Sequence, residues 1–211
     1  ADYDRVLRQR NSLLKSARAS GIRGQLGTLD IWDERLVALG TEIIRARASL
    51  TDELLPEVRA SYAAIAGGEH AASLAGRLSI LSSSTDPDEP EPATEAVRGD
   101  RLTAEETTAA FTAALVRLRR SELDRGLTLA GPHRDDLVLT LNDLPARGYA
   151  SHGESWSFAL ALKLGAAAVL RRESSAGDPV LILDDVFAEL DESRRDRLAG
   201  AVDDFEQVLV T

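Results

Sequence analysis

The chain has 211 residues, 44% of them hydrophobic, and a formal net charge of −10, so it can bury a sizeable core, while its average surface is too acidic to coat nucleic acid or an anionic membrane. It has no cysteine and three scattered histidines, which excludes disulfide frameworks and thiolate metal sites and offers no spacing for a zinc site. It also has no apolar run of about 18 residues and no charged-then-apolar leader, so we expect a cytoplasmic protein with no membrane association.

The first third of the chain has the periodicity of two long helices. Residues 1–15 place apolar pairs about two turns apart, and from Asp30 the apolar residues step by threes, fours and sevens, which suits a seam with a partner helix. Thr28 or Asp30 is the expected N-cap, and Pro56 should kink or end the second helix before its period resumes up to residues 67–68. With a glycine-bearing turn between the helices, the pattern predicts an antiparallel helical arm.

A short strand, a loop and a third helix follow. Residues 78–80 alternate apolar and polar types, as a strand does, whereas residues 82–100 combine prolines, acids and small polar residues and predict a mobile loop. Thr103 and Glu106 have the spacing of a capping box, and Gly126 can end the helix that they begin. The apolar stripe of this helix is formed by Phe111, Leu115 and Leu118.

The character of the sequence changes at Leu127. Residues 127–141 hold two alternating strand patterns on either side of Gly131-Pro132, and Asn142-Asp143 should turn the chain again. Residues 155–172 form a helix that is apolar nearly all round, so we expect it to be buried.

An acidic pair follows the most apolar strand of the chain. Residues 180–183 are Val-Leu-Ile-Leu without polar alternation, which predicts a strand buried on both faces in a parallel sheet. Asp184 and Asp185 come at its carboxyl end, where open α/β sheets place their ligands. Two readings remain open from this stretch alone: an acidic turn, or a Walker B strand in which one carboxylate holds Mg²⁺ and the next acts on the attacking water.

The chain ends with a helix and a strand. The helix begins at about Glu192 with Asp191 as its N-cap, and residues 207–211 begin another buried strand. Strands and helices therefore alternate over residues 150–211, which predicts a parallel sheet there.

The start of the buried helix is a second candidate site. Residues 150–155 read Ala-Ser-His-Gly-Glu-Ser, and a hydroxyl, a glycine and the free N–H groups of a first helical turn can bind an anion. A plain N-cap is the ordinary interpretation of such a segment.

The order of these motifs resembles the carboxyl-terminal lobe of an SMC-like ABC-type ATPase, with signature, Walker B and D-loop in sequence. The resemblance extends to the RecF family of bacterial recombinational-repair ATPases through GPHRDDL at 131–137, RGYASHGESWSFALALKL at 147–164 and LDIWDERLVALG at 29–40. It implies an α/β fold class, with a helical arm domain over residues 1–126 and the returning lobe of a P-loop ATPase domain over residues 127–211.

The resemblance also implies roles for single residues. Asp184 would be the Walker B carboxylate that holds Mg²⁺ through its water shell, and Asp185 would be the catalytic carboxylate, which is Glu in most relatives. Ser151, Gly153 and Glu154 match the signature motif, which contacts the γ-phosphate of ATP in the other subunit. Asp191 matches the D-loop, which faces the opposite active site, and His133 with Arg134 implies a structural or nucleotide-sensing role.

One motif of the family is missing from these 211 residues. No GxxxxGK[ST] occurs, because the only Lys followed by Ser or Thr is Lys15, and Leu14 stands where the glycine must be. The chain starts at Ala1 and has no methionine, so we expect it to be a piece of a longer protein and inactive by itself as an ATPase.

The function implied by the resemblance is an ATP-gated, DNA-binding protein of recombinational repair. Its subunits would dimerise head to tail around ATP and Mg²⁺ on single-stranded, double-stranded or gapped DNA, and its partners would be RecR and RecO and, indirectly, RecA. Two alternatives come from other classes. One is a metal-dependent phosphodiesterase that gathers Asp135 and Asp136 with the Asp184-Asp185 pair, and the other is a non-enzymatic helical interaction module.

Overall fold

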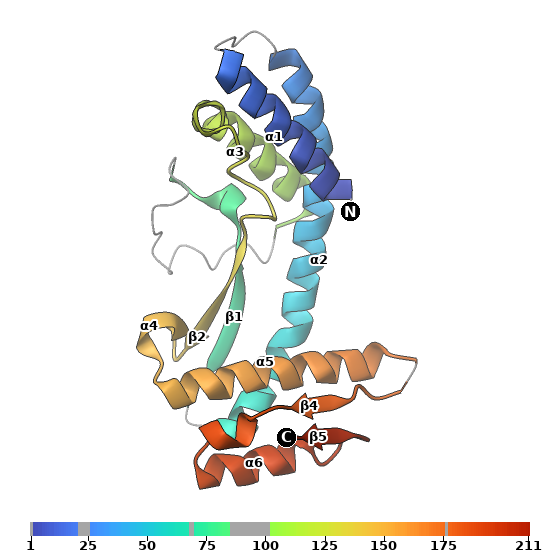
Figure 1. The fold of residues 1–211 in the computed structure, drawn as a ribbon, viewed down its shortest axis with the longest axis vertical. Coiled ribbons are helices and arrows are strands. Elements are labelled where there is room, and N and C mark those ends of the chain that lie inside the picture. Colours follow the sequence, from blue (N-terminus) through green and yellow to red (C-terminus); the bar gives the residue numbers. More distant parts are fainter. Residues whose placement is uncertain (1, 21–25, 68–69, 85–101, 176) are drawn as a thin grey trace. The chain divides into compact units, whose positions relative to one another are not determined.

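The computed structural model describes residues 2–20, 26–67, 70–84, 102–175 and 177–211. The chain forms two compact units, one of residues Ala1–Ser49 with Ala75–Val138 and the other of residues Leu50–Leu74 with Leu139–Thr211. Helix α2 and strands β1 and β2 each have residues in both units (Figure 1). The predicted division of the chain into domains, between residues 126 and 127, was drawn from the order of the motifs, whereas these units are defined by compactness. The domain boundary therefore stays a prediction.

Three helices build the first unit. Helices α1 (Asp2–Ser20), α2 (Leu26–Ala66) and α3 (Ala104–Arg125) contribute to one buried cluster, with the first part of α2 lying beside α1 in Figure 1. The predicted stripe of α3 is buried in this cluster. The predicted capping box of Thr103 and Glu106 is confirmed, and Gly126 ends α3 in the left-handed conformation, with φ 71°. The glycine-bearing turn at 21–25 and most of the predicted mobile loop lie outside the described residues.

Helix α2 differs from the prediction at its start, and of the two alternatives predicted at Pro56, a kink or an end, it excludes the end. It begins at Leu26, so Thr28 and Asp30 lie inside the helix and neither caps it. It also continues through Pro56 rather than ending there. A helix-interior proline costs about 3 kcal/mol. The turns after it bury the apolar residues Val58, Tyr62 and Ile65 completely, which contributes about 1.5–3 kcal/mol for each large apolar side chain and outweighs that cost.

A three-stranded sheet has the order β1-β2-β3. Strand β1 is Ala72–Arg77, so the strand predicted at 78–80 is wrong in position, and Ser79–Leu81 is a 3₁₀ turn, η1. Strands β2 (Asp136–Leu141) and β3 (Leu144–Pro145) pair antiparallel. The predicted turn at Asn142 and Asp143 is confirmed, since both residues have positive φ, 50° and 64°, as a two-residue hairpin loop requires.

The first of the two strands predicted within 127–141 does not form. Residues 127–130 are irregular. The N–H of Leu127 donates to the backbone carbonyl oxygen of Glu122 at 3.3 Å, and the next two N–H groups bond to side chains instead of to a neighbouring strand. The N–H of Thr128 donates to Asn11 Oδ1 at 2.8 Å, and that of Leu129 donates to Glu122 Oε1 at 2.9 Å. Buried N–H groups must be paired, and here polar side chains of α1 and α3 pair them.

Glu122 belongs to a buried polar network centred on Arg10. The Arg10 side chain is fully buried and donates from Nε to Asp33 at 2.6 Å, from Nη1 to Thr128 at 2.8 Å and from Nη2 to Glu122 at 2.6 Å. Burial alone would lower the pKa of Arg10, but the carboxylates of Glu122 and Asp33 raise it overall. The guanidinium therefore stays charged and ties α1 to α2, α3 and the segment that follows α3.

The GPHRDDL motif at 131–137 packs in the same unit. His133 Nδ1 lies 2.8 Å from the Tyr3 hydroxyl and its Nε2 lies 3.3 Å from the carbonyl oxygen of Thr128. One edge of the ring reaches solvent, yet burial of the rest lowers the pKa of His133, against the hydrogen bond with Thr128. Asp135 accepts from the backbone N–H and the hydroxyl of Ser79, both at 2.8 Å, and burial raises the pKa of its carboxyl.

The second unit is built on a parallel pair of strands. Strands β4 (Leu181–Leu183) and β5 (Val208–Val210) pair in parallel, which confirms the parallel sheet predicted for residues 150–211. Helices α5 (His152–Glu173) and α6 (Glu192–Val202) share a buried cluster with β4 and with the 3₁₀ turn η3, Val186–Glu189. The short helix α4, Ala146–Tyr149, precedes α5. Only one face of α5 is buried, whereas the sequence predicted a helix that is buried nearly all round, and Leu170 on the other face is exposed.

Strand β4 is buried on one face, whereas the sequence predicted burial on both. Leu181 and Leu183 are buried, but the side chain of Ile182 between them is 66% exposed. The neighbouring strand β5 was also predicted to be buried, but its Leu209 and Val210 are exposed. A two-stranded sheet that packs against helices on one side leaves its other apolar face open, however apolar the sequence is.

No helix among the described residues has the length and apolarity to cross a bilayer.

We predict that Arg10→Met lowers the free energy of unfolding of the first unit by about 3–5 kcal/mol, because it leaves the buried Glu122 carboxylate without its counter-ion. Urea unfolding followed by Trp32 fluorescence, in a Trp156→Phe background, measures this loss. The matched control is Arg8→Met, since Arg8 is exposed on the same helix. Equal stability of the two variants would contradict a structural role for the network.

We also predict that His133 makes the first unit less stable as the pH falls. The pKa of His133 is lower in the folded chain, so below about pH 6.5 the unfolded chain takes up a proton that the folded chain does not. The contribution of His133 to the free energy of unfolding is therefore fully present above about pH 6.5, and it is lost as the pH falls to the pKa of His133 in the folded chain. His133→Gln should reduce the change in the free energy of unfolding between pH 7 and pH 5, measured by Trp32 fluorescence. The control His152→Gln changes an exposed histidine of the second unit and should leave this pH dependence as it is.

Candidate functional site

The predicted Walker B aspartates lie at the carboxyl edge of the parallel sheet. Asp184 and Asp185 follow β4 directly, and both are exposed. Thr211 occupies the equivalent position after β5, where its N–H donates to the carbonyl oxygen of Leu183 and its hydroxyl donates to Asp184 Oδ1. One oxygen of Asp184 is thus held by the neighbouring strand, while the carboxylate as a whole faces solvent.

Asp185 has an unusual backbone. Its φ and ψ are 54° and 8°, in the left-handed region that residues other than glycine seldom adopt. Asp and Asn tolerate this region better than most residues, but the conformation still stores strain, and such strain is frequent at functional sites. The 3₁₀ turn η3 begins directly after Asp185, so the strained residue sets the direction in which the chain leaves the sheet.

The start of α5 is ordered by a capping box. Ser151 is the N-cap: its hydroxyl accepts from the N–H of Glu154 at 3.3 Å, and the Glu154 carboxylate accepts from the N–H of Ser151 at 2.7 Å. Hydrogen bonds that the Glu154 carboxylate accepts from the Ser151 side chain and backbone lower the pKa of Glu154, and His70, 3.3 Å away, acts in the same direction. The Ser151 side chain remains exposed at the helix start, where the helix dipole favours an anion.

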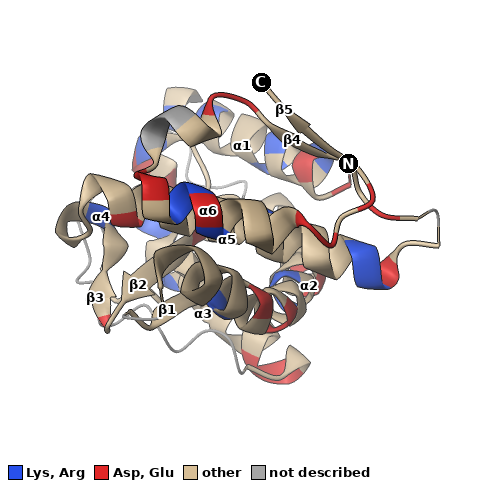
Figure 2. Cartoon of the chain, turned by 90° about the horizontal axis from the view of Figure 1, so that it is seen from below, with Lys and Arg blue, Asp and Glu red and all other residues tan. Residues whose placement is uncertain are grey.

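Arg194 lies between Asp191 and Gly153, the residues predicted to belong to the D-loop and to the signature motif. Asp191 is the N-cap of α6, as predicted, and accepts from the Arg194 N–H at 2.9 Å. The Arg194 guanidinium lies 3.6 Å from the other Asp191 oxygen and packs against Gly153, where any Cβ would overlap its Nη1. Figure 2 shows α6 with basic and acidic residues along its length. Gly153, Asp191 and Arg194 therefore form one contiguous group.

The other predicted residues divide between separate places. Among the described residues, no hydrogen bond or ion pair joins the Asp184-Asp185 pair to Ser151, Gly153 or Glu154. His133 makes its contacts inside the first unit, with Tyr3 and Thr128, and Arg134 is exposed there. The described part of the chain contains no group of three or more histidine or carboxylate side chains able to hold a metal ion.

Two residues of the site were missed from the sequence. Thr211 could have been found from strand register, because it is the residue that follows β5 as Asp184 follows β4. Arg194 carries no such signal. Its position over Gly153 depends on how α5 and α6 pack, which a periodic pattern does not specify.

No protein-family model matches the chain, but the similar proteins found by sequence share one name. The chain is 61% identical over 213 residues to the DNA replication and repair protein RecF of Clavibacter michiganensis subsp. michiganensis, and 55% identical over 214 residues to that of Leifsonia xyli subsp. xyli. Each match covers 100% of this chain, but 53% and 54% of the relative, so the chain spans about half the length of the curated relatives it matches.

Solved structures agree with the sequence matches. Structures titled as the recombination mediator protein RecF with ATP and with ATPrS in the RecFOR pathway each superpose with a TM-score of 0.77 and 26% identity, covering 100% of this chain and 51% of theirs. The predicted fold class, an α/β lobe of an SMC-like ABC-type ATPase with a helical arm, is thereby confirmed. Because sequence and fold match along its whole length, the chain belongs to the RecF family.

Proposed function

We propose that the chain supplies the signature half of a composite ATP site in an ATP-gated, DNA-binding protein of recombinational repair. The observation that carries this proposal is the start of α5, where an exposed serine, fixed by its capping box, stands beside a glycine at the positive end of the helix dipole. Such a helix start suits the γ-phosphate of ATP held by a second subunit. Ser151 would contact the phosphate, Gly153 would permit its close approach, and Glu154 would hold Ser151 in position.

Asp191 and Arg194 extend this surface. Asp191 would face the opposite active site as the D-loop residue, and the Arg194 guanidinium beside Gly153 adds a positive charge at the same helix start. A cation next to the dipole-bearing N-terminus strengthens attraction for a phosphate oxygen. ATP would therefore favour a head-to-tail homodimer, because one subunit completes the site of the other.

The acidic strand end suits a metal ion that is held mainly by nucleotide and water. Mg²⁺ in nucleotide sites commonly takes one or two carboxylates and keeps several waters, so a protein cluster of three ligands is not required. Asp184 fits this role, since it is exposed and Thr211 engages one of its two oxygens. Mg²⁺ bound there would neutralise charge that develops on the phosphates. Asp185 would orient the attacking water and accept its proton.

The remaining parts of the proposal come from the relatives. Their name, DNA replication and repair protein, and the RecFOR pathway of the solved structures support DNA and the proteins of that pathway as partners. RecR and RecO as direct partners, RecA as an indirect partner and a cytoplasmic setting are what the family resemblance implies, and we propose them on that basis. The proposal also requires a phosphate-binding loop of the GxxxxGK[ST] type, which these 211 residues do not contain. Experiments on ATP therefore use the full-length protein that carries this chain.

A phosphodiesterase is less well supported. It needs several carboxylates around two ions, and the described residues contain no group of three or more such ligands. Asp135 is instead engaged by Ser79, and Asp184 by Thr211.

We predict that Ser151→Arg weakens ATP-induced dimerisation by more than about tenfold, because a bulky cation replaces the hydroxyl that meets the partner's phosphate. ATP binding by the monomer should stay nearly unchanged. Analytical ultracentrifugation with and without a slowly hydrolysed ATP analogue measures dimerisation, and fluorescent-nucleotide titration measures binding. Ser174→Arg, at the exposed C-cap of the same helix, is the control and should dimerise normally. Loss of monomer binding in Ser151→Arg would contradict the shared site.

We predict that Asp185→Asn slows ATP hydrolysis about a hundredfold, the size expected for loss of a general base, and prolongs the dimer. Asn tolerates the left-handed backbone of this position, so the fold should be preserved. Asp143→Asn is the matched control, because Asp143 is also exposed with a positive φ but lies in the β2–β3 turn. Steady-state turnover and dimer lifetime are the measurements, and unchanged turnover would remove Asp185 from the catalytic role.

A further inference from the structure

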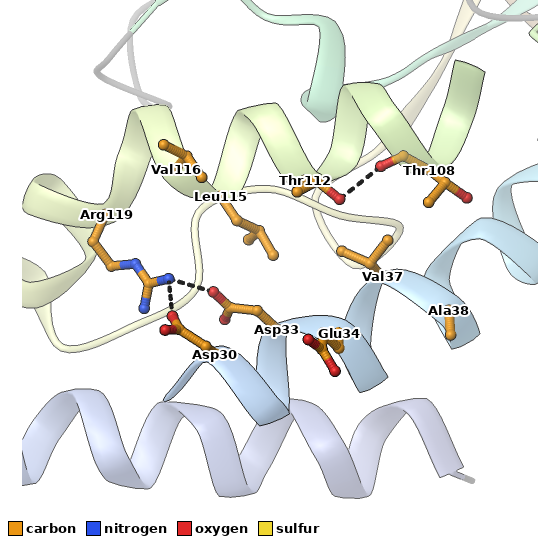
Figure 3. Close-up of a pocket in the computed structure, with 10 residues that line it drawn as sticks. All are labelled: Asp30, Asp33, Glu34, Val37, Ala38, Thr108, Thr112, Leu115, Val116 and Arg119. Carbon is orange, nitrogen blue, oxygen red and sulfur yellow. Dashed lines mark hydrogen bonds and ion pairs between the residues drawn. The ribbon is translucent and has the colours of Figure 1, made fainter. Parts of the chain in front are cut away.

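The first unit carries a solvent-open groove between the first part of α2 and helix α3. Its volume is about 480 Å³, and side chains from the two helices face one another across it (Figure 3). This size lies within the range of pockets that bind small molecules or the anchor side chains of a peptide. None of the residues that line the groove is among those proposed for the ATP site.

The floor of the groove is apolar. It is formed by Val37 and Leu115, which are almost fully buried. Val116, which is 67% exposed, continues this apolar surface toward the mouth of the groove. The hydroxyl of Thr112 donates to the carbonyl oxygen of Thr108 at 2.9 Å, so it is already satisfied inside α3 and adds no open donor to the floor. An apolar side chain entering the groove would therefore lose water without leaving a polar group of Thr112 unpaired.

One end of the groove is closed by ion pairs. Arg119 Nη2 donates to Asp30 at 3.0 Å and to Asp33 at 2.5 Å (Figure 3), and Asp33 in turn accepts from the buried Arg10 at 2.6 Å. Because Arg10 fixes Asp33, this end is part of the buried network and is held in place. A rigid wall of this kind reduces the entropic cost of binding.

The charges around the groove have an excess of negative sign. Three carboxylates, those of Asp30, Asp33 and Glu34, line it against the single guanidinium of Arg119. Glu34 is exposed and makes no ion pair within the described residues, so its charge is available to a partner. The acidic rim repels nucleic acid, and it would also repel the same acidic rim of a second copy of the chain.

We propose that this groove docks an amphipathic helical segment of a partner protein, with aliphatic anchor residues on one face and Lys or Arg beside them. The aliphatic side chains would lie on Val37, Leu115 and Val116, and the basic residue would pair with Glu34 and Asp30. Helices bind apolar grooves in this way through anchors spaced by three or four residues. The charged rim sets which peptides enter, and the apolar floor supplies most of the affinity.

Two synthetic probes test the proposal. Both are labelled 16-residue amphipathic peptides with the same Leu face, one with Lys on its polar face and the other with Glu. Fluorescence anisotropy with the full-length protein should show the Lys peptide binding about tenfold more tightly than the Glu peptide. Glu34→Lys should reverse part of this preference, since it weakens the Lys peptide and strengthens the Glu peptide by about threefold each.

A matched pair of variants tests the position. Val116→Lys should weaken the Lys peptide by about tenfold, because it places a like charge on the apolar floor. Ile31→Lys is the control: Ile31 is also 67% exposed but does not line the groove, so binding should stay within twofold of the unmodified protein. Both positions are exposed, so both variants should fold, which circular dichroism checks.

Three results would overturn the proposal: equal binding of both peptides, equal effects of Val116→Lys and Ile31→Lys, or self-association of the chain that Val116→Lys abolishes. The last would assign the groove to a second copy. None of these results bears on the ATP site, because the readouts are made without nucleotide.

Discussion

The first unit depends on a buried positive charge. Taking a guanidinium out of water costs several kcal/mol unless its nitrogens find acceptors, and each of the three nitrogens of Arg10 has one, in Asp33, Glu122 or Thr128. These acceptors come from α2, α3 and the segment after α3, so one residue of α1 sets the positions of three others. The same demand explains why residues 127–130 are irregular: Glu122 also accepts from Leu129, and a strand would have withdrawn that N–H from it.

Features that depend on a few neighbouring residues could be predicted from the sequence. The capping box at Thr103, the left-handed glycine that ends α3 and the turn at Asn142-Asp143 each follow from local hydrogen bonds and steric limits. Features that depend on distant partners could not. The strand predicted at 127–130 was wrong because side chains of α1 and α3 supplied its hydrogen bonds. The two-sided burial predicted for β4 was wrong because an apolar sequence does not say what covers each face.

The candidate site shows the same distinction. The sequence indicated Asp184, Asp185, Ser151 and Asp191 because each stands at the end of a strand or the start of a helix, which are local properties. It did not indicate that Asp185 has a left-handed backbone or that Arg194 reaches Gly153. It also gave no sign of the groove between α2 and α3, since that groove exists only where two helices distant in the sequence leave space between them.

The absence of a side chain at residue 153 has a consequence for interpreting variants. The Arg194 guanidinium of α6 occupies the space that a side chain at Gly153 would take. Gly153→Ala would therefore displace Arg194 from its place beside Asp191 and would also narrow any phosphate site. Loss of activity in such a variant would then report damage to two loops together. Two further variants separate steric exclusion from lost nucleotide contact. Shortening Arg194 alone leaves Gly153 and its helix intact, whereas shortening Arg194 together with Gly153→Ala removes the clash.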